Sequence, residues 1–139
     1  DESMAGKVNN QFHMLDKLYK SKIKPEMKNR KNADVNRTFA DSPEYDDLRL
    51  FLDVCKEEGI EAMLVLLPIN GWWYYTGFPK DQRETVVQGV EKVASEYGAK
   101  VCSFFDECYT PGFLEDHVHP AGKGWVRINE EAYKFYKEV

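Results

Sequence analysis

An aspartate and a histidine separated by two residues are the clearest candidates for chemistry in this sequence. They lie in the segment Asp116-His117-Val118-His119-Pro120, shortly before the last predicted helix. A carboxylate at this spacing can fix the tautomer of the imidazole and stabilise the cation that forms on proton transfer. The spacing therefore predicts an acid–base pair in which Asp116 orients His119. His119 would then be the general base for a hydroxyl nucleophile elsewhere.

Two other interpretations of this segment remain open. Asp116, His117 and His119 could be three metal ligands, although so compact a cluster lacks the distant ligands that zinc sites usually take. Alternatively, Asp116 caps the following turn and both histidines are solvated. The metal interpretation predicts a stoichiometric metal ion in the purified protein, whereas the acid–base interpretation needs no metal and no cofactor.

A loop rich in aromatic residues is the second candidate for a binding site. Four consecutive aromatics, Trp72 to Tyr75, follow Asn70-Gly71 after a predicted strand. One loop cannot bury all four in the core behind it, so they either stack against a helix of the same domain or form a binding wall. Trp72 and Tyr75 are the candidates for substrate contact. Asn70 is either part of a routine turn or an oxyanion donor through its side-chain amide.

The predicted secondary structure around these residues alternates between helix and strand. Apolar residues at helical spacing predict helices at 41–58, 80–97 and 124–138, after a first helix that ends near Ser21. Glycines at 59 and 98 are the expected helix stops. Runs at 62–67 and 100–105 predict strands that are covered on both faces, as parallel sheets require. The residues expected to pack are Leu48, Phe51, Leu52 and Cys55 of one helix and Trp125, Ile128, Ala132 and Phe135 of the last.

This order of elements predicts an α/β fold, a flavodoxin-like three-layer α/β/α sandwich with a mostly parallel sheet. Two strands are few for a sheet that usually has about four to six. We therefore expect the N-terminal strands of the sheet to be truncated, or to lie within residues 22–41. Ligands of open α/β sheets bind beyond the carboxyl ends of the strands, where the loops 68–79 and 106–122 would meet. Residues 1–40 form a helical, basic lead-in and residues 41–139 the α/β domain.

Composition and charge exclude several classes of protein. With 42% hydrophobic and 31% charged residues, the chain is neither disordered nor of low complexity. Its net charge of −5 is uneven, because residues 1–40 hold nine Lys/Arg against five Asp/Glu and the remainder ten against nineteen. An acidic body argues against nucleic acid as a partner. The basic stretch 17–31 is either a solvated helix end and loop or a surface for an anionic membrane or polyanion.

Several motifs, in order, resemble the C-terminal part of the DltD family. The likeness runs over about residues 42–136 and is carried by the combination of motifs rather than by any single one. The motifs are Ser42-Pro43-Glu44-Tyr45, Leu67-Pro68-Ile69-Asn70-Gly71-Trp72 with Tyr75-Thr76-Gly77, and Asp116-His117-Val118-His119 followed by Gly122-Lys123-Gly124-Trp125.

The resemblance implies both a fold and a function. The fold is that of the SGNH hydrolases, with a Ser–His–Asp arrangement whose Asp and His come from one Asp-x-x-His motif, here Asp116 and His119. The function is D-alanylation of lipoteichoic acid in Gram-positive bacteria, by acyl transfer or (thio)ester hydrolysis. The partners implied are teichoic acid or a D-alanyl carrier. The parent protein would be anchored by an N-terminal membrane helix, with its catalytic domain on the extracellular face of the cytoplasmic membrane.

The nucleophilic serine of the family has no counterpart here. In the family it lies on a turn rich in glycine and serine after the first strand, whereas no serine of this chain follows a buried strand in such a turn. These serines are Ser3, Ser21, Ser42, Ser95 and Ser103. We therefore expect an enzymatic parent protein and an inactive isolated chain. The alternative function is a non-catalytic recognition domain, in which residues 72–75 bind a carrier protein or the teichoic acid polymer.

Overall fold

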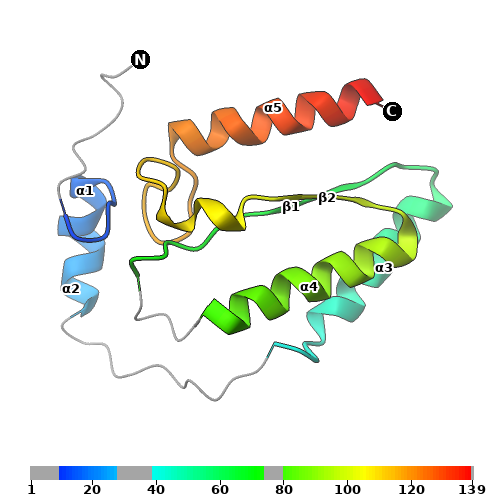
Figure 1. Ribbon diagram of the computed structural model, residues 1–139, viewed down its shortest axis with the longest axis horizontal. Coiled ribbons are helices and arrows are strands. Elements are labelled where there is room, and N and C mark those ends of the chain that lie inside the picture. Colours follow the sequence, from blue (N-terminus) through cyan, green and yellow to red (C-terminus); the bar gives the residue numbers. More distant parts are fainter. Residues whose placement is uncertain (1–9, 28–38, 74–79, 139) are drawn as a thin grey trace.

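A two-stranded parallel sheet lies at the centre of the molecule. The computed structural model describes residues 10–27, 39–73 and 80–138 (Figure 1). Strand β1 (Met63–Leu66) pairs in parallel with β2 (Lys100–Ser103). In this register Met63 lies opposite Lys100 and Leu66 opposite Ser103. Both strands fall within the segments that the apolar runs predict.

Helices cover the sheet on both sides. Helices α3 (Glu44–Glu57) and α4 (Lys80–Tyr97) lie together on one side, and α5 (Gly122–Glu138) lies on the other (Figure 1). This arrangement confirms the α/β fold, while the wider sheet of a full three-layer sandwich stays a prediction. Within the described ranges, no helix is both long and apolar enough to cross a membrane.

The two predicted glycine stops close α3 and α4 in the same way. Gly59 adopts φ 65° and lets the N–H of Ile60 donate to the carbonyl of Cys55 at 2.7 Å. Gly98 adopts φ 67°, and the N–H of Ala99 donates to the carbonyl of Ala94 at 3.0 Å. Both ends are Schellman motifs, which need a left-handed residue that only glycine adopts without strain. Each stop turns the chain directly into the following strand.

The helix faces differ in part from those expected. Leu52 and Cys55 of α3 are buried as predicted, but Phe51 is exposed. Trp125 at the start of α5 was expected to pack and is also exposed, and Ala132 likewise faces solvent. These expectations were wrong because a two-stranded sheet covers only a narrow stripe of each helix. Phe51 and Trp125 are therefore more than half exposed.

The N-terminal helix begins and ends later than predicted. A continuous helical stretch runs through α1 (Asp16–Leu18), a π-helical turn (Tyr19–Ile23) and α2 (Lys24–Met27). Residues 10–15 before it are irregular, so the helix expected to end near Ser21 is displaced toward the C-terminus. Residues 22–27, expected to be a loop, are helical, and the segment 28–38 lies outside the described residues.

Two hydrophobic clusters hold these parts together. The first joins the N-terminal segment to the loop after β1 and consists of Phe12, Met14, Ile23 and Trp73. The second lies at the end of β2, under α5, and consists of Phe104, Phe113 and Leu114. Burying each large side chain contributes on the order of 1.5–3 kcal/mol relative to leaving it exposed. The described part of the basic lead-in is therefore packed onto the loop that follows β1.

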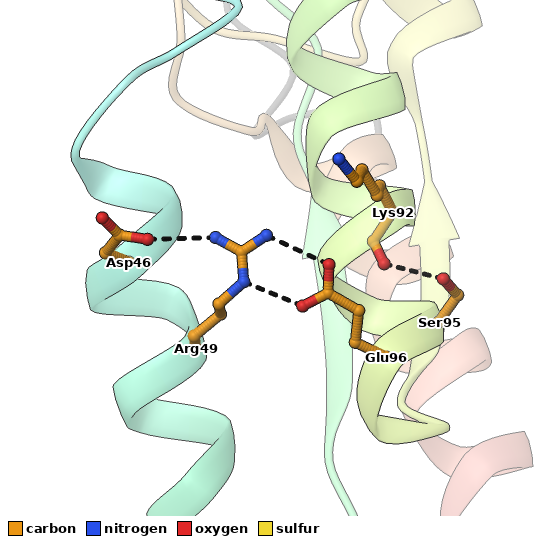
Figure 2. Close-up of polar contacts among 5 residues, drawn as sticks. All are labelled: Asp46, Arg49, Lys92, Ser95 and Glu96. Carbon is orange, nitrogen blue, oxygen red and sulfur yellow. Dashed lines mark hydrogen bonds and ion pairs between the residues drawn. The ribbon is translucent and has the colours of Figure 1, made fainter.

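A network of charges joins α3 to α4 on the surface. The guanidinium of Arg49 on α3 contacts both carboxylate oxygens of Glu96 on α4, at 2.8 and 3.0 Å, and also Asp46 at 3.1 Å (Figure 2). The hydrogen bond from Arg49 lowers the pKa of the Glu96 carboxyl. Figure 2 shows Arg49 pointing from one helix across to the other. The pair therefore links the two helices at their exposed surface.

Candidate active site

Asp116 and His119 are joined by a hydrogen bond between their side chains. The Nδ1 atom of His119 lies 2.7 Å from Oδ2 of Asp116. The Asp116 side chain is 14% exposed, whereas that of His119 is 67% exposed. One side of the pair is therefore anchored in the protein and the other faces solvent. In a neutral imidazole whose Nδ1–H donates to a carboxylate, Nε2 is left as the proton acceptor.

The carboxylate of Asp116 also organises the turn that carries it. Its other oxygen, Oδ1, accepts the backbone N–H groups of Val118 at 2.9 Å and His119 at 2.8 Å. Residues 114 and 120 form an antiparallel bridge that closes the loop. Inside the loop the N–H of Glu115 donates to the carbonyl of His119 at 2.9 Å. The loop is thus a closed unit built around one carboxylate.

Hydrogen bonds keep the Asp116 carboxyl ionised. Burial by itself raises the pKa of this group, but the backbone N–H groups of His119 and Val118 and the ring of His119 together lower it below its usual value. The carboxylate is therefore negatively charged at neutral pH. It lies where it can stabilise a positive charge on the neighbouring imidazole.

Asn70 is buried at the centre of this region, with 3% of its surface exposed. Its Nδ2 group donates to the carbonyl of Phe12 at 2.8 Å and to that of Asp116 at 3.3 Å. Its Oδ1 atom accepts the N–H of Trp72 at 3.0 Å. Its backbone N–H donates to the carbonyl of His117 at 2.9 Å. In this structure the side-chain amide of Asn70 therefore donates to two carbonyl groups. Its role as an oxyanion donor stays a prediction.

The aromatic loop divides between packing and exposure. Trp73 is buried, with its ring 5.0 Å from that of Phe12. Trp72 is half-buried between His13, at 4.2 Å between ring centroids, and Tyr109, at 5.4 Å. Tyr75, the other candidate for substrate contact, lies outside the described residues.

His117 lies against the aromatic loop rather than beside the acid–base pair. Its ring lies 6.1 Å from that of Trp73. Among the residues with described positions, no group of three His, Cys, Asp or Glu side chains could hold a metal ion. The geometry therefore offers the metal interpretation of Asp116, His117 and His119 no support.

Sequence analysis missed the contribution of the N-terminal segment. Phe12 supplies the carbonyl that Asn70 binds, and Leu15 donates its N–H to the carbonyl of Glu115 at 2.8 Å. His13 has φ 51°, an uncommon left-handed conformation for a residue with a side chain. Asn10, whose side chain caps this segment, was the one available signal, because asparagine often hydrogen-bonds nearby backbone.

No serine of the described ranges hydrogen-bonds to His119. Ser42 contacts the carboxylate of Glu44, and Ser95 donates to the carbonyl of Lys92 at 2.7 Å (Figure 2). The other two described serines are also engaged locally, Ser21 with the carbonyl of Lys17 and Ser103 with the N–H of Phe105. These hydroxyl groups serve local backbone and side-chain contacts.

Comparison with known proteins finds one family. A family model described as "DltD protein" matches residues 2–137. The chain is 40% identical over 129 residues to Protein DltD of Bacillus subtilis (strain 168), covering 92% of this chain and 33% of that protein. It is 29% identical over 134 residues to Protein DltD of Staphylococcus aureus (strain NCTC 8325 / PS 47), covering 96% of the chain and 34% of that protein. It is 26% identical over 136 residues to Protein DltD of Lacticaseibacillus rhamnosus. The chain spans about a third of the length of these relatives.

Proposed function

The chain belongs to the DltD family, and on this premise we propose that it supplies two members of a Ser–His–Asp arrangement that acts in the D-alanylation of lipoteichoic acid. Asp116 and His119 are these two members. The serine would come from the part of the relatives that this chain does not span. The parent protein would then be an acyltransferase or a (thio)esterase, and the isolated chain would be inactive.

The proposed chemistry assigns the proton transfers to His119 and the stabilisation of its positive charge to Asp116. His119 takes the proton of the serine hydroxyl through Nε2 as the oxygen attacks the carbonyl carbon of a D-alanyl ester or thioester. The imidazolium then gives this proton to the departing alcohol or thiol. In the second half, His119 takes a proton from water or from a polymer hydroxyl as that oxygen attacks the carbonyl carbon of the acyl-serine. The bond between the acyl group and the serine oxygen then breaks, and the imidazolium returns its proton to that oxygen. Asp116 stays ionised throughout and stabilises the imidazolium.

One observation carries this proposal, the 2.7 Å contact between the solvent-facing imidazole of His119 and the largely buried carboxylate of Asp116. A solvated histidine beside a turn-capping aspartate would not need this alignment. Here the same carboxylate uses one oxygen to cap the turn and the other to bind the ring. Trp72 and Tyr75 are the proposed substrate contacts.

The test requires a full-length member of the family, in which the counterparts of both residues are replaced. We expect His119→Ala to lower turnover by as much as about 10⁶-fold, and Asp116→Asn by about 10⁴-fold, as in other triads. The measurement is the D-alanine ester content of lipoteichoic acid in cells that carry only the variant.

The control is Asn129→Ala, because Asn129 is exposed on α5 and has no part in the pair. D-alanine content at the unsubstituted level in His119→Ala cells, with the variant present in normal amount, would refute the catalytic role. Loss of D-alanine in the Asn129→Ala cells as well would point to damage unrelated to the pair.

A non-catalytic recognition domain is the second candidate function. It is favoured by the aromatic cluster of His13, Trp72 and Tyr109, since partly exposed aromatic rings are typical of binding surfaces. In this case the partner would be a carrier protein or the teichoic acid polymer. A serine-reactive phosphonate distinguishes the two functions. Labelling of one serine in a full-length member supports the enzyme, whereas polymer binding without labelling supports the recognition domain.

The proposed location follows from the substrate. Lipoteichoic acid is a polymer of the cell envelope, so the parent protein would act on the extracellular face of the cytoplasmic membrane. The basic residues from Lys17 to Lys24 would then provide local positive charge toward an anionic polymer or membrane, which the acidic remainder of the chain does not.

A further inference from the structure

Asn70 makes more contacts with the surroundings of the acid–base pair than its place in a turn requires. Through its side chain and its backbone it binds three separate segments: the N-terminal segment, the Asp116 loop and its own strand-end turn. The first two partners lie 58 and 46 residues away in sequence. A side chain that only shaped its own turn would need just the hydrogen bond from the N–H of Trp72.

Its two contacts with the Asp116 loop fall on consecutive carbonyl groups. The side-chain amide donates to the carbonyl of Asp116, and the backbone N–H donates to that of His117. In a trans peptide the C=O and N–H groups of one unit point in opposite directions. Holding the carbonyl of His117 on Asn70 therefore directs the N–H of Val118 the opposite way, toward Oδ1 of Asp116.

The third contact joins Asn70 to the N-terminal segment. The carbonyl of Phe12, which also binds the amide of Asn70, belongs to a segment shaped by Asn10. Oδ1 of Asn10 accepts the N–H groups of Phe12 at 3.2 Å and Met14 at 3.3 Å. The same segment reaches the loop again through Leu15 and Glu115. The loop is thus held at two points by one preorganised segment.

Only an uncharged amide satisfies all these partners. The carbonyls of Phe12 and Asp116 need donors, and the N–H of Trp72 needs an acceptor. An aspartate would supply the acceptor without the donors, and an apolar residue would supply neither. Because Asn70 is 3% exposed, water could not readily replace the lost partners.

We propose that Asn70 is a positioning residue for the Asp116–His119 pair, which orients the Asp116 carboxylate by fixing the two peptide units that follow it. The inference rests on the proposed function only in that the pair is taken to be catalytic. In the described part of the chain, His119 is the one titratable side chain that contacts this carboxylate. The pKa of Asp116 therefore reports on the alignment of the turn, with little contribution from other titratable groups.

The test compares the 139-residue chain with its Asn70→Ala and Asn70→Leu variants. The second variant keeps most of the volume and adds no charge. Titration of the Asp116 carboxyl carbon by NMR should show its pKa rising toward the usual value of 3.8 in both variants. Exchange of the Val118 and His119 amide protons with solvent should quicken by at least about tenfold, because their hydrogen bonds to the carboxylate loosen.

The control variant is Leu52→Ala, which removes a buried side chain of α3 and so lowers stability away from the loop. It should leave the Asp116 titration unchanged, which separates positioning from general loss of stability. An unchanged Asp116 titration in a folded Asn70 variant would overturn the inference. No step of this test measures activity. Normal D-alanylation by a full-length protein with His119→Ala would therefore refute the proposed function without changing the conclusion about the positioning role of Asn70.

If both Asn70 variants fail to fold, hydrogen exchange in the unsubstituted chain tests the positioning role of Asn70 instead. The side-chain amide protons of Asn70 should be protected from exchange, while those of exposed Asn129 should not. Equal, rapid exchange at the two asparagines would show that the hydrogen bonds to Phe12 and Asp116 do not persist. The positioning role would then be ruled out.

Discussion

The Asp116 carboxylate has two tasks, and its two oxygens divide them. Oδ1 accepts two backbone N–H groups and Oδ2 binds the imidazole of His119. Because the backbone bonds fix the carboxylate, little freedom is lost when the imidazole becomes charged. Preorganised charge of this kind stabilises a developing cation more effectively than mobile solvent does. The exposed position of His119 leaves its other nitrogen open to a proton donor.

The lowered pKa of Asp116 predicts a specific acid sensitivity. A carboxyl group with a lower pKa in the folded than in the unfolded chain binds fewer protons when folded, so the free energy of unfolding falls as pH decreases. The loss should occur between the usual value of 3.8 and the lower folded pKa. Asp116→Asn should remove this part of the pH dependence, measured by urea unfolding at a series of pH values. Equal slopes below pH 4 in the two proteins would contradict it.

Among the elements, α5 begins in close contact with the loop that precedes it. Gly124 is buried, and a Cβ atom there would lie 2.4 Å from the carbonyl oxygen of Phe113. Phe113 is itself fully buried in the loop that precedes α5. The helix can therefore begin directly beside the loop that carries the acid–base pair only because this position has no side chain.

Replacing this glycine should reverse the usual effect of alanine in a helix. Alanine normally favours a helix over glycine by about 1 kcal/mol, but the overlap with a backbone atom should make Gly124→Ala destabilising by about 1–3 kcal/mol. Gly122→Ala is the matched control, since nothing lies within 4 Å of its added Cβ. Thermal and urea unfolding of both variants give the comparison. A Gly124→Ala protein as stable as the control would disprove the close approach.

For the whole molecule, the outer face of α3 is the notable surface. Leu50, Phe51 and Val54 are 65%, 54% and 51% exposed and lie on adjacent turns of one helix. Contiguous apolar surface of this kind is uncommon on monomeric proteins and promotes association. The relatives are about three times as long as this chain, so their remaining parts offer one way to cover such a face.

The 139-residue chain should therefore bind a hydrophobic dye and self-associate through α3. The double variant Leu50→Lys, Val54→Lys should reduce both effects while changing the free energy of unfolding by less than about 1 kcal/mol, because both side chains are already exposed. Dye fluorescence and sedimentation velocity measure the outcome. Asp53→Lys, also exposed on α3, controls for the change in charge. Equal dye binding by the double variant and the unsubstituted chain would exclude this face.

Features that depend on neighbouring residues could be predicted from the amino-acid sequence. The strands, the glycine stops at 59 and 98 and the extent of α4 follow from local periodicity and backbone preference. The contact between Asp116 and His119 was predictable for the same reason, because a turn of four residues brings the first and last side chains together. Its catalytic role stays a prediction.

Contacts between residues far apart in the chain could not be predicted in this way and became visible in the folded molecule. Trp73 is buried, although its sequence pattern left packing and binding open, and Trp125 is exposed, although its pattern predicted packing. Burial depends on which residues lie opposite a side chain in the folded chain. Asn70 likewise finds partners 58 and 46 residues away. A hydrogen bond between distant segments has no local periodicity to reveal it, since it forms only after packing has brought the two backbones within about 3 Å.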